Sequence, residues 1–370
     1  MCRGGFLYIM KKLIAMLLML VMACGMLVSC DEDRVFGSYL PNYDDYEPEV
    51  QEKITLNLYI ITDDTTAQNA MDTVALNINL FTTRNYNTEL KVHYLSEAKY
   101  QSKVTEKVSA TDEDAANIIL INNVALFTSL QNAGKLVDMT PYLATDEFGM
   151  LNVNVAPALL ESAKVGDKVY AIPNNHVIGE YEYLVIDKWA NNEFKIIPPS
   201  MFDNDLGPAE LEGLDTLVAD LREKLAENGY DPDEYIYKTH GPYELQEELE
   251  ADGKLECLAV KNPVATPKTA LSSAFAIINR GSAANERAMQ IIYEINMNPE
   301  FRNLLQYGVL DINYKLNDGK VEMIKSNTTT YSMNLLYTGN VFNAYYCEEI
   351  GWTETVANNG KLQNKEAVSE

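Results

Sequence analysis

Carboxylate, amide and imidazole side chains are the groups in this chain that could do chemistry, and their spacing decides which chemistry is open to them. His93, His176 and His240 lie far apart and form no His-x-x-x-His pair, and the chain contains no Cys-x-x-Cys pair. It also lacks a Gly-x-Ser-x-Gly nucleophile turn and a phosphate-binding loop. We therefore expect no metal, no cofactor and no catalytic residue. A glycosidase pair among the 54 acidic residues stays open, because only separation in space identifies one.

Two pairs of polar side chains directly follow predicted buried strands. Residues 54–61 alternate and then become continuously apolar, which is typical of a buried parallel strand, and Asp63 and Asp64 come just after them. Asn122 and Asn123 follow a second apolar segment in the same way. Such positions at the end of parallel strands favour ligand binding. A helix N-cap is the alternative for the aspartates, and a plain turn is the alternative for the asparagines.

The elements that position these residues alternate between strand and helix. Apolar residues from Ala67 to Ile78 have helical spacing, and segments 90–95 and 118–121 supply two further strands. This βαβαβ order is the beginning of a doubly wound α/β sheet. The same patterns predict helices over 214–225 and 288–295, strands over 255–260 and 275–278, and a new helix at Asn298-Pro299-Glu300.

Charge and length narrow the classes of function. The 370 residues include 54 acidic and 29 basic side chains, for a formal net charge of −25, whereas a nucleic-acid partner needs a basic face. A hydrophobic content of 47% with 22% charged residues indicates a globular protein, and 370 residues exceed what one core usually holds. We therefore expect two lobes and no nucleic-acid partner.

The first thirty residues have the pattern of a lipoprotein signal peptide. Lys11 and Lys12 precede an apolar run over 13–28, and the sequence Leu27-Val28-Ser29-Cys30 resembles the lipobox, in which the cysteine is lipidated. An uncleaved membrane anchor is the weaker alternative, because the run is shorter than the ~20 residues that a spanning helix needs.

This pattern predicts how the mature chain begins. We expect residues 1–29 to be removed, with Met10 as the real start, and residues 30–50 to form a lipidated cysteine followed by a flexible acidic tether. Cys257 and Cys347 then remain beside Cys30. Two cysteines do not make a disulfide framework, so they either pair or act as small buried apolar residues.

Several sequence segments in the middle of the chain resemble the motifs of one protein family and occur in the same order. Residues 134–143 read GKLVDMTPYL, residues 165–175 read VGDKVYAIPNN, and residues 184–188 read LVIDK. They resemble the G-x-L-x-D-L-T-P-Y-L segment, the G-K-x-Y-x-I-P hairpin and the following strand of the extracellular carbohydrate-type solute-binding proteins of ABC transporters, with Asp187 in place of the usual asparagine. Similar segments follow at 274–278, 286–289 and 304–308.

The resemblance implies an α/β fold of the two-lobed, periplasmic-binding-protein-like type II class, with each lobe a mostly parallel sheet flanked by helices. It implies a sugar or oligosaccharide held in the cleft between the lobes. Lobe 1 is then residues 51–142 plus 265–310, and lobe 2 is residues 143–264 plus 311–370.

The chain departs from the family in its second lobe. The segment between Lys188 and Cys257 is shorter than in the family, and residues 360–370 end the chain without the closing helices that we expect there. These departures predict either a reduced lobe 2 or a truncated gene.

The resemblance also implies partners and a location. We expect a monomer, lipid-anchored on the extracytoplasmic face of the cell membrane, that delivers its ligand to ABC permease subunits. A degenerate binding lipoprotein acting as a surface sensor or adhesin is one alternative. A surface glycan hydrolase is another.

Sugar binding requires planar polar groups, which bond hydroxyls in pairs, and aromatic rings, which stack on pyranose rings. On the family reading, the ligand-binding candidates are Asp63, Asp64, Asn122, Asn123, Asn174, Asn175, Tyr181, Tyr183, Tyr337 and Trp352. Loop, edge-strand and core-packing roles are the alternatives for each of them.

Overall fold

The computed structural model describes residues 52–202 and 211–370. The predicted signal peptide, the lipidated Cys30 and the acidic tether lie outside these residues and stay predictions. No helix within the two described ranges is long and apolar enough to cross a membrane.

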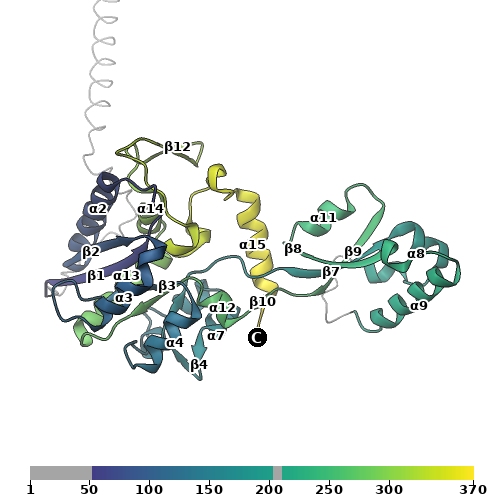
Figure 1. The fold of residues 1–370 in the computed structure, drawn as a ribbon, viewed down its shortest axis with the longest axis horizontal. Coiled ribbons are helices and arrows are strands. Elements are labelled where there is room, and N and C mark those ends of the chain that lie inside the picture. The colour runs from purple at the N-terminus through teal and green to yellow at the C-terminus, as the bar shows by residue number, and fades with distance from the viewer. Residues whose placement is uncertain (1–51, 203–210) are drawn as a thin grey trace, which may run out of the picture. The chain divides into compact units, whose positions relative to one another are not determined.

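A five-stranded mixed sheet combines four strands from residues 54–173 with a fifth from residues 274–277 (Figure 1). Its strands, in spatial order, are β2 (Thr88–Leu95), β1 (Ile54–Ile61), β3 (Ile118–Ile121), β11 (Ala274–Ile277) and β6 (Ile172–Pro173). β1 runs parallel to β2 and β3, whereas β11 runs antiparallel to β3 and to β6. The continuously apolar β3 is buried along its whole length, as a strand covered on both faces must be.

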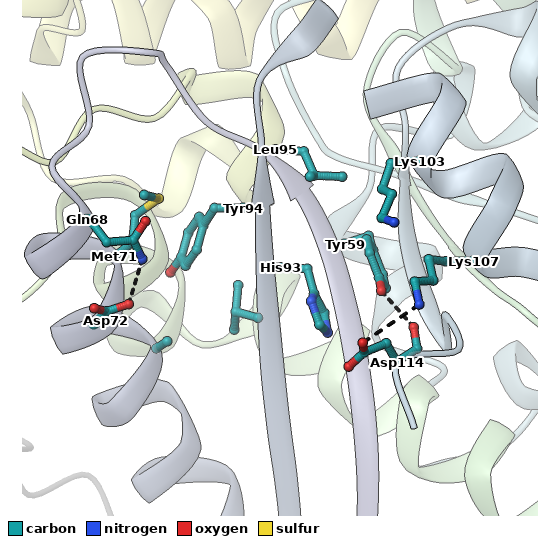
Figure 2. A pocket seen from close by; sticks show the side chains of 12 residues that line it. Tyr59, Gln68, Met71, Asp72, His93, Tyr94, Leu95, Lys103, Lys107 and Asp114 are labelled. Atoms are coloured by element: carbon teal, nitrogen blue, oxygen red, sulfur yellow. Dashed lines mark hydrogen bonds and ion pairs between the residues drawn. The ribbon is translucent and has the colours of Figure 1, made fainter. Parts of the chain in front are cut away.

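Helices cover both faces of this sheet. α2 (Gln68–Tyr86) buries Val74 and Ile78, and α3 (Glu97–Ser109) buries Tyr100, whose hydroxyl lies 2.7 Å from the carbonyl oxygen of Leu120. Side chains of α2 and α3 lie on opposite sides of β1 and β2 (Figure 2). Right-handed crossovers produce this arrangement when β2 and β3 flank β1. The predicted βαβαβ unit is confirmed.

The later predicted helices are also confirmed. α9 (Leu214–Glu227), α13 (Ser282–Met297) and α14 (Pro299–Tyr307) cover the predicted segments. Asn298 caps α14, accepting hydrogen bonds from the backbone N–H groups of Glu300 at 2.9 Å and Phe301 at 3.2 Å.

A second sheet corrects one expectation. β7 (Tyr181–Asp187), β8 (Ile236–Gly241) and β9 (Leu255–Lys261) form a sheet of order β8-β7-β9 in which β7 is antiparallel to both neighbours, not the mostly parallel sheet expected of each lobe. Ile186 near the end of β7 pairs with Ile236 at the start of β8, so the chain leaves and re-enters the sheet at the same end. The parallel arrangement of this sheet was implied by the family resemblance alone, because hydrophobic periodicity carries no information about strand direction.

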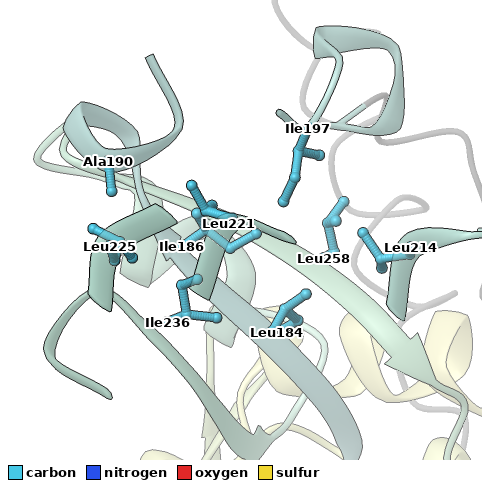
Figure 3. Packing of buried hydrophobic residues seen from close by; sticks show 9 residues of the cluster. All are labelled: Leu184, Ile186, Ala190, Ile197, Leu214, Leu221, Leu225, Ile236 and Leu258. Atoms are coloured by element: carbon cyan, nitrogen blue, oxygen red, sulfur yellow. The ribbon is translucent and has the colours of Figure 1, made fainter. Parts of the chain in front are cut away.

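The second sheet has a core on each face. α8 (Lys188–Phe194) and α9 cover one face through a cluster of aliphatic side chains that includes Leu184, Leu221 and Leu258 (Figure 3). α11 (Leu245–Glu250) packs near the other face, where Tyr181, Tyr183, Val185 and Cys257 form a second cluster.

A C-terminal helix corrects the expectation of a chain without closing helices. α15 (Glu354–Glu366) is capped by Thr353, whose hydroxyl accepts from the backbone N–H of Val356 at 3.2 Å, and β14 (Val368–Ser369) then pairs with β10 (Val264–Ala265). The buried face of α15 consists of Ala357, Gly360, Gln363 and Asn364. Because small and polar side chains make this face, the sequence has no apolar periodicity from which to predict the helix.

The remaining elements are short. They are α4 (Val124–Asn132), α5 (Thr140–Leu143), α6 (Leu151–Asn154), α7 (Pro157–Ser162), β4 (Lys164–Val165), β5 (Lys168–Val169), the 3₁₀ turn η1 (Pro199–Phe202), α10 (Pro232–Tyr235), α12 (Pro267–Ala270), β12 (Tyr314–Asn317), β13 (Lys320–Met323), and the 3₁₀ turns η3 (Leu335–Thr338), η4 (Val341–Asn343) and η5 (Glu348–Ile350).

Cys257 and Cys347 are free and buried, each in its own hydrophobic cluster. Of the two alternatives for these residues, the structure supports the small buried apolar role.

Candidate ligand-binding site

The carboxyl ends of β1, β2, β3 and β6 lie at one edge of the five-stranded sheet, called the carboxyl edge below. β11 runs the other way, so its first residue, Ala274, pairs with Ile121 at the end of β3 and with Pro173 at the end of β6. The structure brings together at this edge the predicted residues that directly follow strands, namely Asp63, Asp64, Asn122, Asn123 and Asn174.

Asp63 is an exposed carboxylate held in one orientation. Its Oδ1 accepts from the backbone N–H of Thr65 at 2.8 Å and from the hydroxyl of Thr65 at 2.6 Å. These bonds to the side chain and backbone of Thr65 lower the pKa of the Asp63 carboxyl. The N-cap of α2 is Ala67, so the alternative role of the two aspartates as helix caps is wrong.

Asn122 and Asn123 form a half-buried amide pair. Oδ1 of Asn123 caps α4 by accepting from the N–H of Leu126 at 2.8 Å, and Nδ2 of Asn123 donates to Oδ1 of Asn122 at 2.8 Å. This pairing orients the Asn122 side chain and leaves its Nδ2 without a protein acceptor among the described residues.

Residues 330–338, called the edge segment, run along the carboxyl edge. At one end, the carbonyl oxygen of Ser332 accepts from the N–H of Asp63 at 3.3 Å and from the hydroxyl of Thr66 at 2.9 Å. At the other end, the carbonyl oxygen of Leu336 accepts from Nδ2 of Asn174 at 2.8 Å and from the hydroxyl of Ser273. The predicted lobe boundaries place the edge segment in lobe 2, yet these hydrogen bonds join it to residues that flank strands of the five-stranded sheet.

Polar side chains of α14 donate hydrogen bonds to backbone carbonyls of the edge segment. Nη2 of the fully buried Arg302 donates to the carbonyl of Leu335 at 3.0 Å, and Nε2 of Gln306 donates to the carbonyl of Met333 at 2.8 Å. Burial lowers the pKa of Arg302 to about 10, so the guanidinium stays charged at neutral pH.

Of the two tyrosines in the edge segment, Tyr331 is fully buried and Tyr337 is partly exposed near the carboxyl edge. Tyr337 is half-buried, and burial together with the nearby carboxylate of Glu97 raises its pKa, which keeps the phenol neutral. Glu97 is the first residue of α3, immediately after β2. Sequence reasoning missed Glu97, although it follows a predicted strand just as Asp63 and Asn122 do.

The other candidates from the middle of the chain are packed groups in the structure. Asn174 is fully buried, and its Nδ2 bonds the hydroxyl of Ser273 at 2.9 Å as well as Leu336, while its Oδ1 is buried without a partner. Asn175 donates to the carbonyl of Asn154 at 2.8 Å and accepts from the N–H of Ala156 at 3.2 Å.

Tyr181, Tyr183 and Trp352 are also buried. The Tyr181 hydroxyl donates to Glu366 at 2.9 Å, and the Tyr183 hydroxyl donates to the carbonyl of Pro242 at 3.0 Å. The Trp352 ring packs against Phe342 with centroids 5.8 Å apart. A ligand role for these residues and for Asn174 and Asn175 stays a prediction.

Two cavities lie beside the two sheets. One of about 340 Å³ adjoins the outer strand β2, where the rings of Tyr59 and His93 stack at 4.3 Å beside Lys107 and Asp114 (Figure 2). A second of about 580 Å³ adjoins Glu182, whose carboxylate lies 2.8 Å from Lys238 and 2.9 Å from Lys261. Within the described ranges, no group of three or more metal-ligating side chains is assembled.

Comparison with solved structures identifies the fold of this chain. No protein-family model matches the chain, and no curated protein matches it. Three solved structures of the N-glycan transport solute binding protein NgtS from Streptococcus pneumoniae do match: one without a named ligand, one in complex with Man1GlcNAc and one with Man5GlcNAc. They share 17–18% sequence identity with this chain, cover 86% of it and 83–84% of their own length, and superpose with TM-scores of 0.54–0.55.

This chain has the type II periplasmic-binding-protein-like fold. The α/β fold predicted from the sequence is thereby confirmed. The type II fold also explains the site: a sheet with parallel strands β2, β1 and β3 and helices on both faces presents polar loop residues at one edge.

Proposed function

We propose that the protein is an extracellular solute-binding protein that captures a sugar or oligosaccharide at the carboxyl edge and delivers it to an ABC permease. The observation that carries this proposal is the type II fold shared with NgtS over 86% of the chain. NgtS is described as an N-glycan transport protein and was solved with two mannose-containing glycans, so a glycan is the first ligand class to test.

The chemistry of the carboxyl edge supports a neutral, hydroxyl-rich ligand. Asp63 and Glu97 supply carboxylate acceptors, Asn122 supplies an amide donor, and Tyr337 supplies a half-buried ring. Carboxylates and amides can bond neighbouring hydroxyls in pairs, and the ring can stack on the apolar face of a pyranose.

The proposed mechanism is binding followed by closure of the second sheet toward the carboxyl edge. Two chain segments, residues 174–180 and 262–265, connect the second sheet to the rest of the described chain, and such short connections are where hinges form. Ligand favours the closed state only through its greater affinity for that state. The permease then distinguishes loaded from empty protein by shape.

We propose that no catalytic step accompanies binding. A glycoside hydrolase needs one carboxyl with a raised pKa to protonate the leaving group. At Asp63, the hydrogen bonds from Thr65 lower the pKa instead, so this residue is unsuited to act as the acid. Anchoring of the mature chain through a lipid on Cys30 completes the proposal and rests on the signal-peptide pattern alone.

A thermal-shift screen of residues 31–370 against mono- and oligosaccharides tests the proposed function. A ligand that binds only the folded state raises the melting temperature by mass action. A clear shift with one sugar class would support the proposal and identify that class. Cooperative melting without any shift would count against it and favour a sensor or adhesin role.

A further inference from the structure

Three aromatic side chains gather at the end of the second sheet that lies away from its two connections. They are Trp189 in α8, Tyr230 after α9 and Tyr235 at the end of α10. The ring centroid of Trp189 lies 5.2 Å from that of Tyr230 and 5.6 Å from that of Tyr235. The centroids of the two tyrosine rings lie 5.7 Å apart. Trp189 nevertheless exposes 45% of its surface and Tyr230 exposes 39%.

The rings are held in place by the structure beneath them. Asp187 caps α8 by accepting from the N–H of Trp189 at 2.8 Å, and Tyr235 packs against the aliphatic cluster of Figure 3. Arg222 donates to the carbonyl of Ile236 at 3.0 Å and forms an ion pair with Asp233 of α10. Each ring meets a neighbour edge-on or tilted, so the three limit one another's movement. The cluster is therefore preorganised, which lowers the entropic cost of binding.

The size of this aromatic cluster favours a small ring-shaped ligand over a protein. Along α8, α9, α10 and β8, the large hydrophobic side chains that are exposed in the described structure are Trp189, Tyr230 and Tyr237. A stable protein interface covers ~800 Å² on each partner and involves roughly 20–30 residues a side, far more than three rings. One or two pyranose rings match the cluster in size.

The surroundings of the cluster also match a neutral sugar. Asp231, Asp233 and Glu234 are exposed on α10 and its cap, next to Tyr230 and Tyr235. Asp233 is paired with Arg222, whereas the carboxylates of Asp231 and Glu234 can accept hydroxyl hydrogen bonds at the rim of a stacked sugar and repel phosphate and other anionic ligands.

We propose that Trp189, Tyr230 and Tyr235 form a second glycan-binding site that stacks a sugar ring and is separate from the carboxyl edge. Tyr181, at the start of β7, pairs with Gly241 next to the connections, whereas Ile186 pairs with Ile236 next to the aromatic cluster. At ~3.3 Å per residue, the strand places the two ends of the sheet roughly 17 Å apart. The site holds a long glycan, or keeps the protein on a polysaccharide, independently of capture at the carboxyl edge.

Tryptophan fluorescence tests this site directly, because the chain has two tryptophans and only one is accessible. Trp352 is 4% exposed and Trp189 is 45% exposed, so acrylamide quenches mainly Trp189 in the wild-type protein. The probes are Man5GlcNAc, maltoheptaose and chitohexaose, each titrated into the protein to millimolar concentration. We expect at least one of them to protect Trp189 from acrylamide in a saturable way. Trp352→Phe serves as a second background in which Trp189 is the single emitter.

Variants separate the two sites. Tyr230→Ala should weaken the protection of Trp189 at least about tenfold, as expected when a principal stacking ring is lost. Tyr237→Ala, which removes an exposed ring outside the cluster, should leave the protection of Trp189 unchanged. Asp63→Asn at the carboxyl edge should also leave it unchanged.

The outcomes distinguish this inference from the proposed function. Protection of Trp189 without any binding that depends on Asp63 would uphold the second site and contradict sugar capture at the carboxyl edge. No protection by any probe, in a protein that melts cooperatively, would overturn the second site, as would protection that disappears in Asp63→Asn. Self-association that depends on Trp189, seen by sedimentation, would assign the rings to a second copy and would also overturn it.

Discussion

Gln363 of α15 is bonded to Gly179 of the first connecting segment through a hydrogen bond of 2.8 Å from its Nε2 to the glycine carbonyl. The same Nε2 donates to the carbonyl of Ile178 at 2.8 Å, and Oε1 accepts from the N–H of Tyr243 beyond β8 at 3.0 Å. One buried amide thus ties the C-terminal helix to a connection and to a loop of the second sheet.

Asn364 and β14 extend this attachment. Nδ2 of Asn364 donates to the carbonyl of His176 at 2.8 Å, and its Oδ1 accepts from the N–H of Ile178 at 2.9 Å. β14 pairs with β10 on the second connection. α15 and β14 therefore bind both connecting segments, and we expect them to limit the proposed closure.

Gln363→Ala should destabilise the protein by ~1–3 kcal/mol, because it removes three hydrogen bonds and leaves the buried carbonyl of Ile178 without its donor. Urea unfolding followed by circular dichroism measures the change. Lys361→Ala, an exposed substitution on the same helix, is the matched control and should change stability by less than ~0.5 kcal/mol. Equal effects of the two substitutions would show that the bonds of Gln363 contribute nothing to stability.

The ionisation of Glu182 should make the free energy of unfolding depend on pH in the acid range. Hydrogen bonds from Lys238 and Lys261 lower the pKa of its carboxyl from 4.5 to about 2. Since the folded-state pKa lies below the unfolded one, the stabilisation is complete above about 4.5 and is lost as pH falls toward about 2.

The substitution Glu182→Gln checks this dependence. Wild type should be the more stable protein near neutral pH, and the difference should shrink over that acid range and with added salt. Glu180→Gln, an exposed neighbour that lines the same cavity, is the control and should show no such difference. A wild-type advantage that persisted at pH about 2 would contradict the assignment.

The buried thiols should be unreactive in the folded protein. Burial raises the pKa of Cys257 to about 12 and also raises that of Cys347, so neither forms the thiolate that reacts. With residues 31–370, Ellman's reagent should label neither cysteine under native conditions and both in denaturant. Absence of labelling in denaturant would instead reveal a disulfide between them.

Asp63→Asn should weaken sugar binding about tenfold while leaving the fold intact. The amide oxygen can still accept the two bonds from Thr65, so the substitution removes the charge and one acceptor without releasing the loop. Asp167→Asn, in the exposed turn between β4 and β5, is the matched control. If both variants bound sugar equally well, the carboxylate of Asp63 would have no part in the site.

Much of the fold could be predicted from apolar spacing, and the exceptions have physical causes. β1, α2, β2, α3 and β3 bury apolar faces of regular period, so their sequence predicts them. α15 buries Gln363 and Asn364, which hydrogen-bond to backbone groups distant in sequence, and no local pattern indicates that.

Some of the candidate site residues could likewise be predicted from the sequence, and others could not. Asp63 and Asn122 were predicted because a residue that follows a parallel strand must lie at the carboxyl edge. Tyr181 and Tyr183 are predicted as ligand contacts from the family resemblance, whereas the structure buries both rings in a hydrophobic cluster of the second sheet. A tyrosine in a cleft and a tyrosine in a core look alike in a sequence, because only the fold decides how much of the ring is buried.

Calorimetric titration of the purified protein with Man5GlcNAc and maltoheptaose, beside the double variant Asp63→Asn with Tyr337→Ala, tests the central claim most directly. The account predicts saturable binding of at least one of these glycans by wild type and its loss in the double variant, with the cooperative melt of the variant preserved. Binding that is undiminished in the double variant, or no binding of either glycan by a cooperatively folded wild type, would contradict sugar capture at the carboxyl edge.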